Sequence, residues 1–179
     1  MAHHRTMPVM GLEDPEMLLH HLMQADEFGV KLEVEGSTQR WEFFPSPLHQ
    51  GVIRRIDRSV RQKPGIARMG CSCFTLSDFY LQLKDGSLKR PDLAIFCEEP
   101  ELTREALRVI PGAIVEILSP GSQEKDLTTG PPIYLASGVL DVLVVDPEKR
   151  EVTHIRKDGR LTLPSPVDIE LEMGCLVTA

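Results

Sequence analysis

The chain has 179 residues and a mass of 20.1 kDa, the size of one ordinary domain with a core of its own. Hydrophobic residues make up 41% of the chain, which is typical of globular rather than disordered proteins. The formal net charge of -7 argues against a protein that coats nucleic acid non-specifically, but it leaves room for one local basic face. Apolar runs are too short to span a bilayer and a signal-peptide core is missing, so we expect a cytoplasmic protein with no membrane partner.

The first part of the chain predicts a tail, a helix and a hairpin. Residues 1–11 look like a flexible tail. The Asp-Pro pair at 14–15 suits the N-cap and the first position of a helix. Apolar and polar residues alternate over 30–35, which indicates a half-buried strand. A turn at Gly36 would join this strand to a partner over 40–44.

A Pro-Ser-Pro break at 45–47 precedes an amphipathic helix predicted over 49–62. The apolar residues of this segment share one face, and basic residues gather on or near the other. This cluster stands out in an acidic chain, either as a solvated face or as a contact for a phosphate backbone. Its members are Arg54, Arg55, Arg58, Arg61 and Lys63.

The middle of the chain predicts three strands, two of which carry an acid. Asp92 lies in the strand over 90–96, and Glu116 lies in the apolar strand over 113–118. A third apolar strand follows at 139–145. A buried acid is costly unless it is paired or bound to a cation. Two strands that each bring one such acid therefore predict a metal site.

The segments around these strands give weaker signals. Residues 75–83 favour a strand, and the turn signal at 84–87 makes it an antiparallel neighbour of the Asp92 strand. Residues 98–109 begin acidic and are expected to form a short helix.

Prolines complicate the helix that follows the Glu116 strand. Ser122 is a possible cap, but the Gly-Pro-Pro sequence at 130–132 interrupts the helix, because proline breaks a helix interior. The helix therefore either runs from Pro131 to Ser137 or is kinked there, and Gly138 suits its C-cap. Further strands are expected at 151–156 and near 168–177.

Helices and strands alternate only in the middle, and hairpins flank them. This order predicts an α/β (α+β) fold in which helices flank a mixed sheet. With no internal repeat or linker, residues 1–179 are expected to form a single domain.

The four cysteines, at 71, 73, 97 and 175, lack the paired spacing of a zinc finger. We expect ordinary reduced thiols, with a zinc or redox role as the alternative.

Several motifs of the middle segment form a specific pattern, and on them the chain resembles the Uma-two endonuclease family of the PD-(D/E)xK restriction-endonuclease-like superfamily. The resemblance covers about residues 12–156. It also includes the first hairpin and the entry into the basic helix. The matching stretches are Pro91-Asp92, Val115 to Pro120, Tyr134 ahead of Gly138-Val139, and Asp141 to Pro147.

The resemblance implies a DNA endonuclease, with a homodimer as the expected assembly. In it Asp92 and Glu116 would bind Mg²⁺ or Mn²⁺, with the carbonyl of Ile117 as a third oxygen ligand. Such hard cations take carboxylate, carbonyl and water oxygens. Glu33 would be a further acid of the site and His49 would orient it, although Glu33 can also be read as a solvated strand residue.

One departure from the family pattern puts catalysis in doubt. The superfamily lysine that comes two residues after the second acid is Leu118 here. In the Uma-like branch a helix lysine four residues after the acid at Asp126 replaces it, and that position is Gly130. Lys125 is the nearest substitute, more than a helical turn earlier. The alternatives are a weakened nuclease, or a lapsed nuclease fold that binds DNA or a protein partner. A role as an assembly or toxin–antitoxin component is a looser possibility.

Simpler roles are also open for each of these residues. Asp92 could pair with Arg90, and Glu116 with Lys125. Tyr134 is expected to serve packing rather than chemistry.

Overall fold

The computed structural model describes residues 20, 22–25, 27, 30–36, 38–43, 45–64, 71–120 and 122–179. Predictions for the tail at 1–11, the helix start at 14–15 and the loop that follows Pro64 lie outside these residues. The described positions between 20 and 27 are helical, in line with the first predicted helix.

A six-stranded sheet forms the centre of the molecule, in the order β11-β10-β9-β8-β7-β4. Neighbouring strands are antiparallel except for β8 and β9, which are parallel and are joined by a helical crossover, as parallel neighbours require. The strands are β4 (Phe74–Leu76), β7 (Leu93–Phe96), β8 (Ala113–Ile117), β9 (Asp141–Asp146), β10 (Glu151–Arg156) and β11 (Gly159–Pro164).

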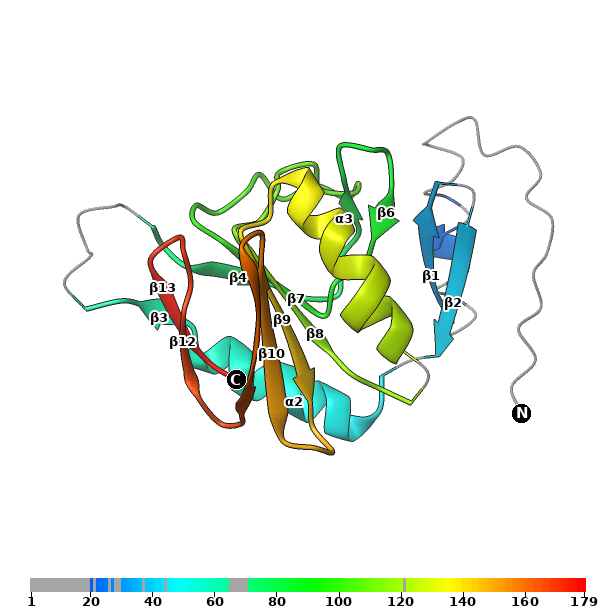
Figure 1. The fold of residues 1–179 in the computed structure, drawn as a ribbon. Helices are drawn as coiled ribbons and strands as arrows, with labels where there is room; N and C mark the ends of the chain where they lie inside the picture. The colour runs from blue at the N-terminus through cyan, green and yellow to red at the C-terminus, as the bar shows by residue number, and fades with distance from the viewer. Residues whose placement is uncertain are drawn as a thin grey trace.

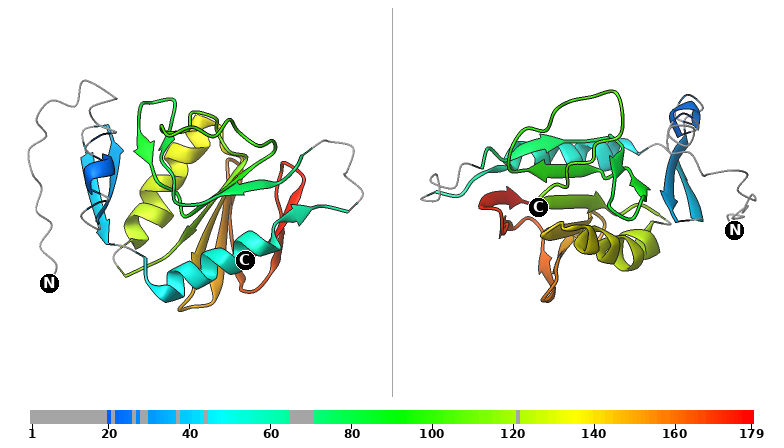
Figure 2. Two further views of the ribbon diagram at one scale, coloured as in Figure 1. Left: turned by 180° about the vertical axis from the view of Figure 1, so that it is seen from behind. Right: turned by 90° about the horizontal axis from the view of Figure 1, so that it is seen from above.

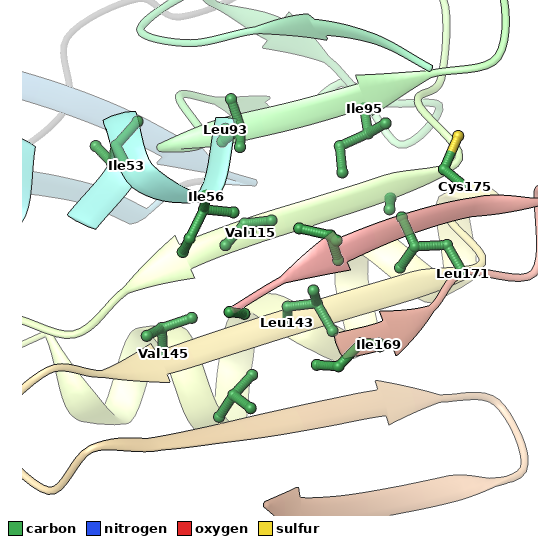
Figure 3. Close-up of a cluster of buried hydrophobic side chains, with 14 of the residues drawn as sticks. Ile53, Ile56, Leu93, Ile95, Val115, Leu143, Val145, Ile169, Leu171 and Cys175 are labelled. Atoms are coloured by element: carbon green, nitrogen blue, oxygen red, sulfur yellow. The ribbon is translucent and has the colours of Figure 1, made fainter. Parts of the chain in front are cut away.

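Helices cover both faces of this sheet. Helix α2 (Pro47–Ser59) packs on one face and α3 (Gly130–Ser137) on the other (Figure 1), and the view from above in Figure 2 shows the strands between them. Because side chains alternate along a strand, each central strand supplies two cores. Figure 3 shows the core on the α2 face, where Ile53 and Ile56 meet Val115 and Leu143.

Two smaller sheets complete the fold. The order of the first is β2 (Thr38–Phe43), β1 (Val30–Glu35), β6 (Leu88–Lys89) and β5 (Leu81–Gln82). The order of the second is β12 (Asp168–Glu170), β13 (Cys175–Thr178) and β3 (Arg61–Gln62), and it joins the core on the α2 face. None of the described helices is long and apolar enough to cross a membrane.

Most predicted elements are present, and two predictions are wrong. The stretch 75–83 is not one strand: β4 ends at Leu76 and β5 begins at Leu81, with Asp78 between them at a φ of 59°. Only β4 pairs antiparallel with β7, while the turn at 84–87 joins β5 to β6. The stretch 98–109 is not a helix, because Leu107 uses its backbone N–H and C=O on Tyr80 and Gln82.

The double proline is accommodated by a widened helix turn. Segment η2 (Lys125–Thr129) is a π-helix that continues directly into α3, with the N–H of Gly130 bonded to the carbonyl of Lys125. Pro131 has no N–H for the carbonyl of Leu127, four residues earlier. The Nη2 of Arg160 approaches that carbonyl instead, at 3.5 Å. Gly138 ends α3 at a φ of 110°, as predicted.

The expectation of four reduced thiols is wrong. Cys73 and Cys175 form a disulfide across 102 residues of sequence, and Cys71 and Cys97 are free. Sequence spacing missed the pair because the two residues meet only when the C-terminal hairpin packs beside β4.

Candidate active site

The two acids of the central strands lie on one face of the sheet. Leu93 of β7 pairs with Val115 of β8, so the preceding residue Asp92 stands opposite Glu116, and directly opposed side chains share a face. The backbone N–H of Asp92 donates to Glu116 Oε2 at 3.3 Å, and the N–H of Ile117 donates to Asp92 Oδ2 at 2.8 Å. The structure therefore brings together Asp92, Glu116 and the backbone of Ile117.

Glu33 reaches the same place from β1. Its side chain is 1% exposed, so it is not a solvated strand residue. Glu33 Oε1 accepts from the backbone N–H of Arg90 at 3.1 Å, two residues before Asp92. Glu33 Oε2 is buried and accepts no hydrogen bond from the described residues; the Lys89 ammonium lies 3.5 Å from it.

Three buried lysines, Lys31, Lys89 and Lys125, lie close to these acids. Lys125 Nζ is 3.7 Å from Glu33 Oε1. Lys31 Nζ is 3.9 Å from the same oxygen and 3.7 Å from Asp92 Oδ1. Burial opposes the ionisation of Glu33, but Lys125, Lys31 and Lys89 outweigh it and lower the pKa of Glu33. Glu33 is therefore a fixed negative charge at the centre of the cluster.

Helix α2 contributes His49, as the family resemblance implies. The Ser46 side chain caps the helix by accepting from the His49 N–H. The His49 Nε2 lies 3.0 Å from Asp92 Oδ2. Burial opposes the ionisation of Asp92, but His49 and Lys31 outweigh it and lower the pKa of Asp92. Arg90, by contrast, pairs with Asp78 at 2.8 Å, and a pairing of Asp92 with Arg90 is not seen.

Glu116 has the opposite electrostatic character. Burial, together with repulsion from Asp92 and Asp126, raises the pKa of Glu116 to about 8, although Lys125 and Lys31 act against the rise. Glu116 is therefore mostly protonated at neutral pH when no metal ion is bound. Tyr134 donates its hydroxyl proton to Glu116 Oε1 at 2.7 Å.

Tyr134 serves packing, as expected, and its hydroxyl adds a hydrogen bond to Glu116 that the sequence did not predict. The side chain is 1% exposed and lies in the core on the α3 face. The available signal was its place one helical turn after Gly130, on the same side of α3.

Lys125 lies within the cluster even though it precedes the family's lysine position. It is buried, and its Nζ is 3.2 Å from Asp126 Oδ1 as well as near Glu33. The π-helix places it there, and such segments are frequent at functional sites. Gly130 lies beside it, and a Cβ at Gly130 would be 3.0 Å from the Lys125 carbonyl oxygen. A narrow pocket, too tight to admit a water molecule, is lined by Glu33, Lys89, Glu116, Lys125, Asp126, Gly130 and Tyr134.

The donor set suits a hard divalent cation held by few protein ligands. In the described part of the chain, no three acidic side chains bring their oxygens within 4.8 Å of one another. Mg²⁺ is commonly held by one or two carboxylates and keeps several waters. Asp92 and Glu116 fit that pattern, and a residue's N–H and C=O point to the same side of a strand, so the Ile117 carbonyl faces Asp92 as well.

The basic cluster of the sequence divides in two. Arg54, Arg55 and Arg58 are exposed on α2. Arg61 instead pairs with Asp168 at 2.8 Å, and Lys63 pairs with Glu170. Only the three helix arginines therefore present a basic face that these acids do not neutralise.

Comparisons with known proteins agree with this architecture. The family model described as "Uma2: Putative restriction endonuclease" matches residues 25–174. A search of curated proteins finds no match. Among solved structures, the chain is similar to a "putative nuclease belonging to DUF820 from Anabaena variabilis ATCC 29413", with a TM-score of 0.58 and 15% identity over 80% of this chain and 83% of the other. Since the family model spans most of the sequence, the chain belongs to the Uma2 family of restriction-endonuclease-like proteins.

Proposed function

We propose that this protein is a divalent-metal-dependent endonuclease that hydrolyses phosphodiester bonds in DNA. The proposal depends on two hydrogen bonds between β7 and β8, which lie inside a cluster of buried lysines. The Asp92 N–H donates to the Glu116 carboxylate, and the Ile117 N–H donates to the Asp92 carboxylate. Asp92, Glu116 and the Ile117 carbonyl would hold Mg²⁺ or Mn²⁺. The cation would supply an activated water and neutralise charge on the phosphodiester.

Lys125 takes the role of the helix lysine that is absent at Gly130. Its ammonium lies 3.7 Å from Glu33 Oε1 and 3.2 Å from Asp126 Oδ1, and its charge also favours ionisation of Glu116. A fixed positive charge at this point stabilises the negative charge that develops on the phosphate in the transition state. The π-helix supports the assignment because it directs a residue one position before Asp126 into the pocket.

Glu33 and His49 have positioning roles in this proposal. Glu33 contacts Lys125, Lys31 and Lys89, so it fixes where the ammonium groups lie. His49 contacts Asp92 Oδ2 and orients that carboxylate. Both are expected to act through these neighbours rather than on the phosphodiester itself.

The DNA backbone would contact the exposed arginines of α2. Arg54, Arg55 and Arg58 lie on the same helix whose first turn carries His49. Arginine binds phosphate oxygens well and adds affinity without sequence preference. This face therefore explains how an acidic protein would approach DNA.

The direct test is cleavage of supercoiled plasmid with Mg²⁺ or Mn²⁺. The wild type is expected to nick or linearise the plasmid, and chelation of the metal should stop the reaction. Asp92→Asn removes one ligand charge and is expected to lower the rate about 1000-fold.

The matched control is Asp168→Asn, which changes an exposed acid that pairs with Arg61 on the second small sheet. This variant should cut like the wild type. Equal cutting by wild type and Asp92→Asn would point to a contaminating nuclease and overturn the proposal.

The second candidate is a lapsed nuclease fold that binds DNA or a protein partner without cutting it. It is favoured by the missing side chain at Gly130 and by lysines that already neutralise the acids. The two candidates differ in metal binding. Calorimetric titration with Mn²⁺ should show one site that Asp92→Asn weakens in a nuclease, and no such site in a lapsed fold.

Gly130→Lys is a further way to separate the two candidates. The new Cβ would press on the Lys125 carbonyl, so the π-turn must relax to admit it. A gain of cutting would show that the rest of the site is competent. A homodimer stays a prediction, for which light scattering is the measurement.

A further inference from the structure

All four cysteines of the chain gather at the end of β7 remote from Asp92. Cys71 and Cys73 precede β4, Cys97 follows β7, and Cys175 begins β13. The pairing of Phe74 with Phe96 brings the segment before β4 beside the segment after β7.

Backbone contacts hold these segments together. The N–H of Ser72 donates to the Cys97 carbonyl at 2.6 Å. Cys175 pairs with Gln62, and the amide of Gln62 donates to the Cys71 carbonyl at 2.5 Å. Three segments distant in sequence are therefore fixed around one point.

The sulfur atoms are as close as the ligands of one metal ion. Cys71 Sγ is 3.8 Å from Cys73 Sγ and 3.4 Å from Cys175 Sγ. Cys97 packs against the hydrophobic cluster that contains Cys71 and Cys175, which brings its side chain to the same region. Among the described residues, Cys71, Cys73 and Cys175 are the one set of three candidate ligands whose donor atoms all lie within 4.8 Å.

We propose that the reduced chain binds one Zn²⁺ between Cys71, Cys73, Cys97 and Cys175, and that the Cys73–Cys175 disulfide is the oxidised state of this site. Tetrahedral zinc with bonds of about 2.3 Å to sulfur separates its ligand sulfurs by about 3.8 Å, which is close to the distances from Cys71. A donor set of thiolates alone selects zinc over the hard cations of the acid site.

The disulfide does not prevent this assignment. The Cα atoms of Cys73 and Cys175 are 6.0 Å apart, so the reduced side chains can separate by rotation about their own bonds. Cys97 is partly exposed, which gives an ion a way into a site whose other thiols are largely covered.

The interconversion requires a reductant. A phosphine reductant breaks the sulfur–sulfur bond and gives two thiols; the phosphine is oxidised to its oxide, and water supplies the oxygen and the two protons. Zn²⁺ then displaces the protons of the four thiols. Bond cleavage and metal binding therefore balance without any group from the protein beyond its cysteines.

The site would be structural. Cys97 lies five positions after Asp92 along an extended strand, a span of about 16 Å, so the ion would not meet a substrate at the acids. It would tie the outer ends of β4 and β7 to the C-terminal hairpin of β12 and β13. Closed four-thiolate zinc sites contribute folding energy in this way.

The test uses the full chain carrying Asp92→Asn and Glu116→Gln, so that the acid site takes up no metal. After reduction with the phosphine and removal of metal, Co²⁺ should give the intense charge-transfer and d–d bands of tetrahedral thiolate coordination. Zn²⁺ should bleach these bands at one ion per chain by elemental analysis. The oxidised protein should give no bands.

Cys71→Ser should weaken the bands and the metal affinity, whereas Ser72→Ala keeps every thiol and should bind as the parent does. A second measurement needs no change at the cysteines: bound Zn²⁺ should protect four thiols of the reduced parent from alkylation, as counted by mass spectrometry. A reduced parent without thiolate bands, or with thiols alkylated equally fast with and without Zn²⁺, would overturn the assignment.

Discussion

The two faces of the central sheet differ sharply, although neighbouring residues of the same strand supply both. Val115 and Ile117 of β8 lie in the hydrophobic core under α2. Glu116, between them, points to the α3 side, where it meets Tyr134 and the field of Asp92 and Lys125. A buried acid is tolerated there because positive charges and donors surround it. One face therefore supplies stability, and the end of the other holds the charged groups that chemistry needs.

The largest expected effect comes from a substitution that disturbs only the core on the α2 face. Leu143→Ala removes a fully buried side chain of β9 that packs against the α2 core. The free energy of unfolding should fall by about 3 kcal/mol, from lost burial and the cavity left behind. Urea denaturation measures the loss.

The comparison predicts that Leu143→Ala leaves the cutting rate per folded molecule unchanged. Leu161→Ala, on the exposed edge strand β11, is the matched control and should alter stability little. A loss of cutting in folded Leu143→Ala protein would show that the two faces are not independent.

Lys125→Met tests whether a charged group on the α3 face contributes to cutting. It keeps a long side chain but removes the charge beside Glu33 and Asp126. The cutting rate should fall about 100-fold, because a transition-state charge loses a fixed partner. Single-turnover cleavage of plasmid measures the effect. Lys84→Met, which changes an exposed lysine, should leave the rate unchanged, and an equal rate in Lys125→Met would remove Lys125 from the mechanism.

A pH titration sharpens the contrast between Glu116 and its neighbours. Because the pKa of Glu116 is raised to about 8, a divalent cation must displace a proton at any lower pH. The Mn²⁺ affinity should therefore rise with pH, by up to about tenfold per unit, and level off above pH 8. Calorimetry across this range measures it. In Glu116→Gln the slope should disappear, while an unchanged slope would assign the proton to another group.

The smallest expected effect concerns the hydroxyl that joins the core on the α3 face to the acids. Tyr134→Phe deletes the 2.7 Å bond to Glu116 and leaves the ring in place. The free energy of unfolding should fall by about 1 kcal/mol, the usual contribution of one buried hydrogen bond. Tyr80→Phe, whose hydroxyl makes a longer bond of 3.4 Å to Leu22, should change the melting curve less. A larger loss in the control would contradict this ranking.

Local patterns predicted much of the fold correctly. The strand over 30–35, the helix behind Ser46 and the strand over 151–156 all depend on interactions between near neighbours in the chain, although the first strand is buried on both faces and not half-buried. The stretch 98–109 was misassigned because its backbone partners, at Tyr80 and Gln82, lie far away in sequence. The secondary-structure propensity of a short segment contains no information about such distant partners.

The candidate site shows the same division. Asp92 and Glu116 were identifiable because an acid inside an apolar strand is anomalous by itself. Lys125 was predicted only as the nearest substitute, because it lies more than one helical turn before Gly130, and a π-turn before two prolines brings it to the acids. Tyr134 and the gathering of the four cysteines carried no local signal of this kind.

Most strands and helices, the two acids and the irregular helix turn before the prolines were thus determined by the sequence itself, since each depends on residues within a few positions of one another. Tertiary structure alone decided which charges neutralise the acids and which thiols meet. Those contacts join segments as distant as Cys73 and Cys175. They arise only when burying apolar surface packs the separate sheets and helices against one another.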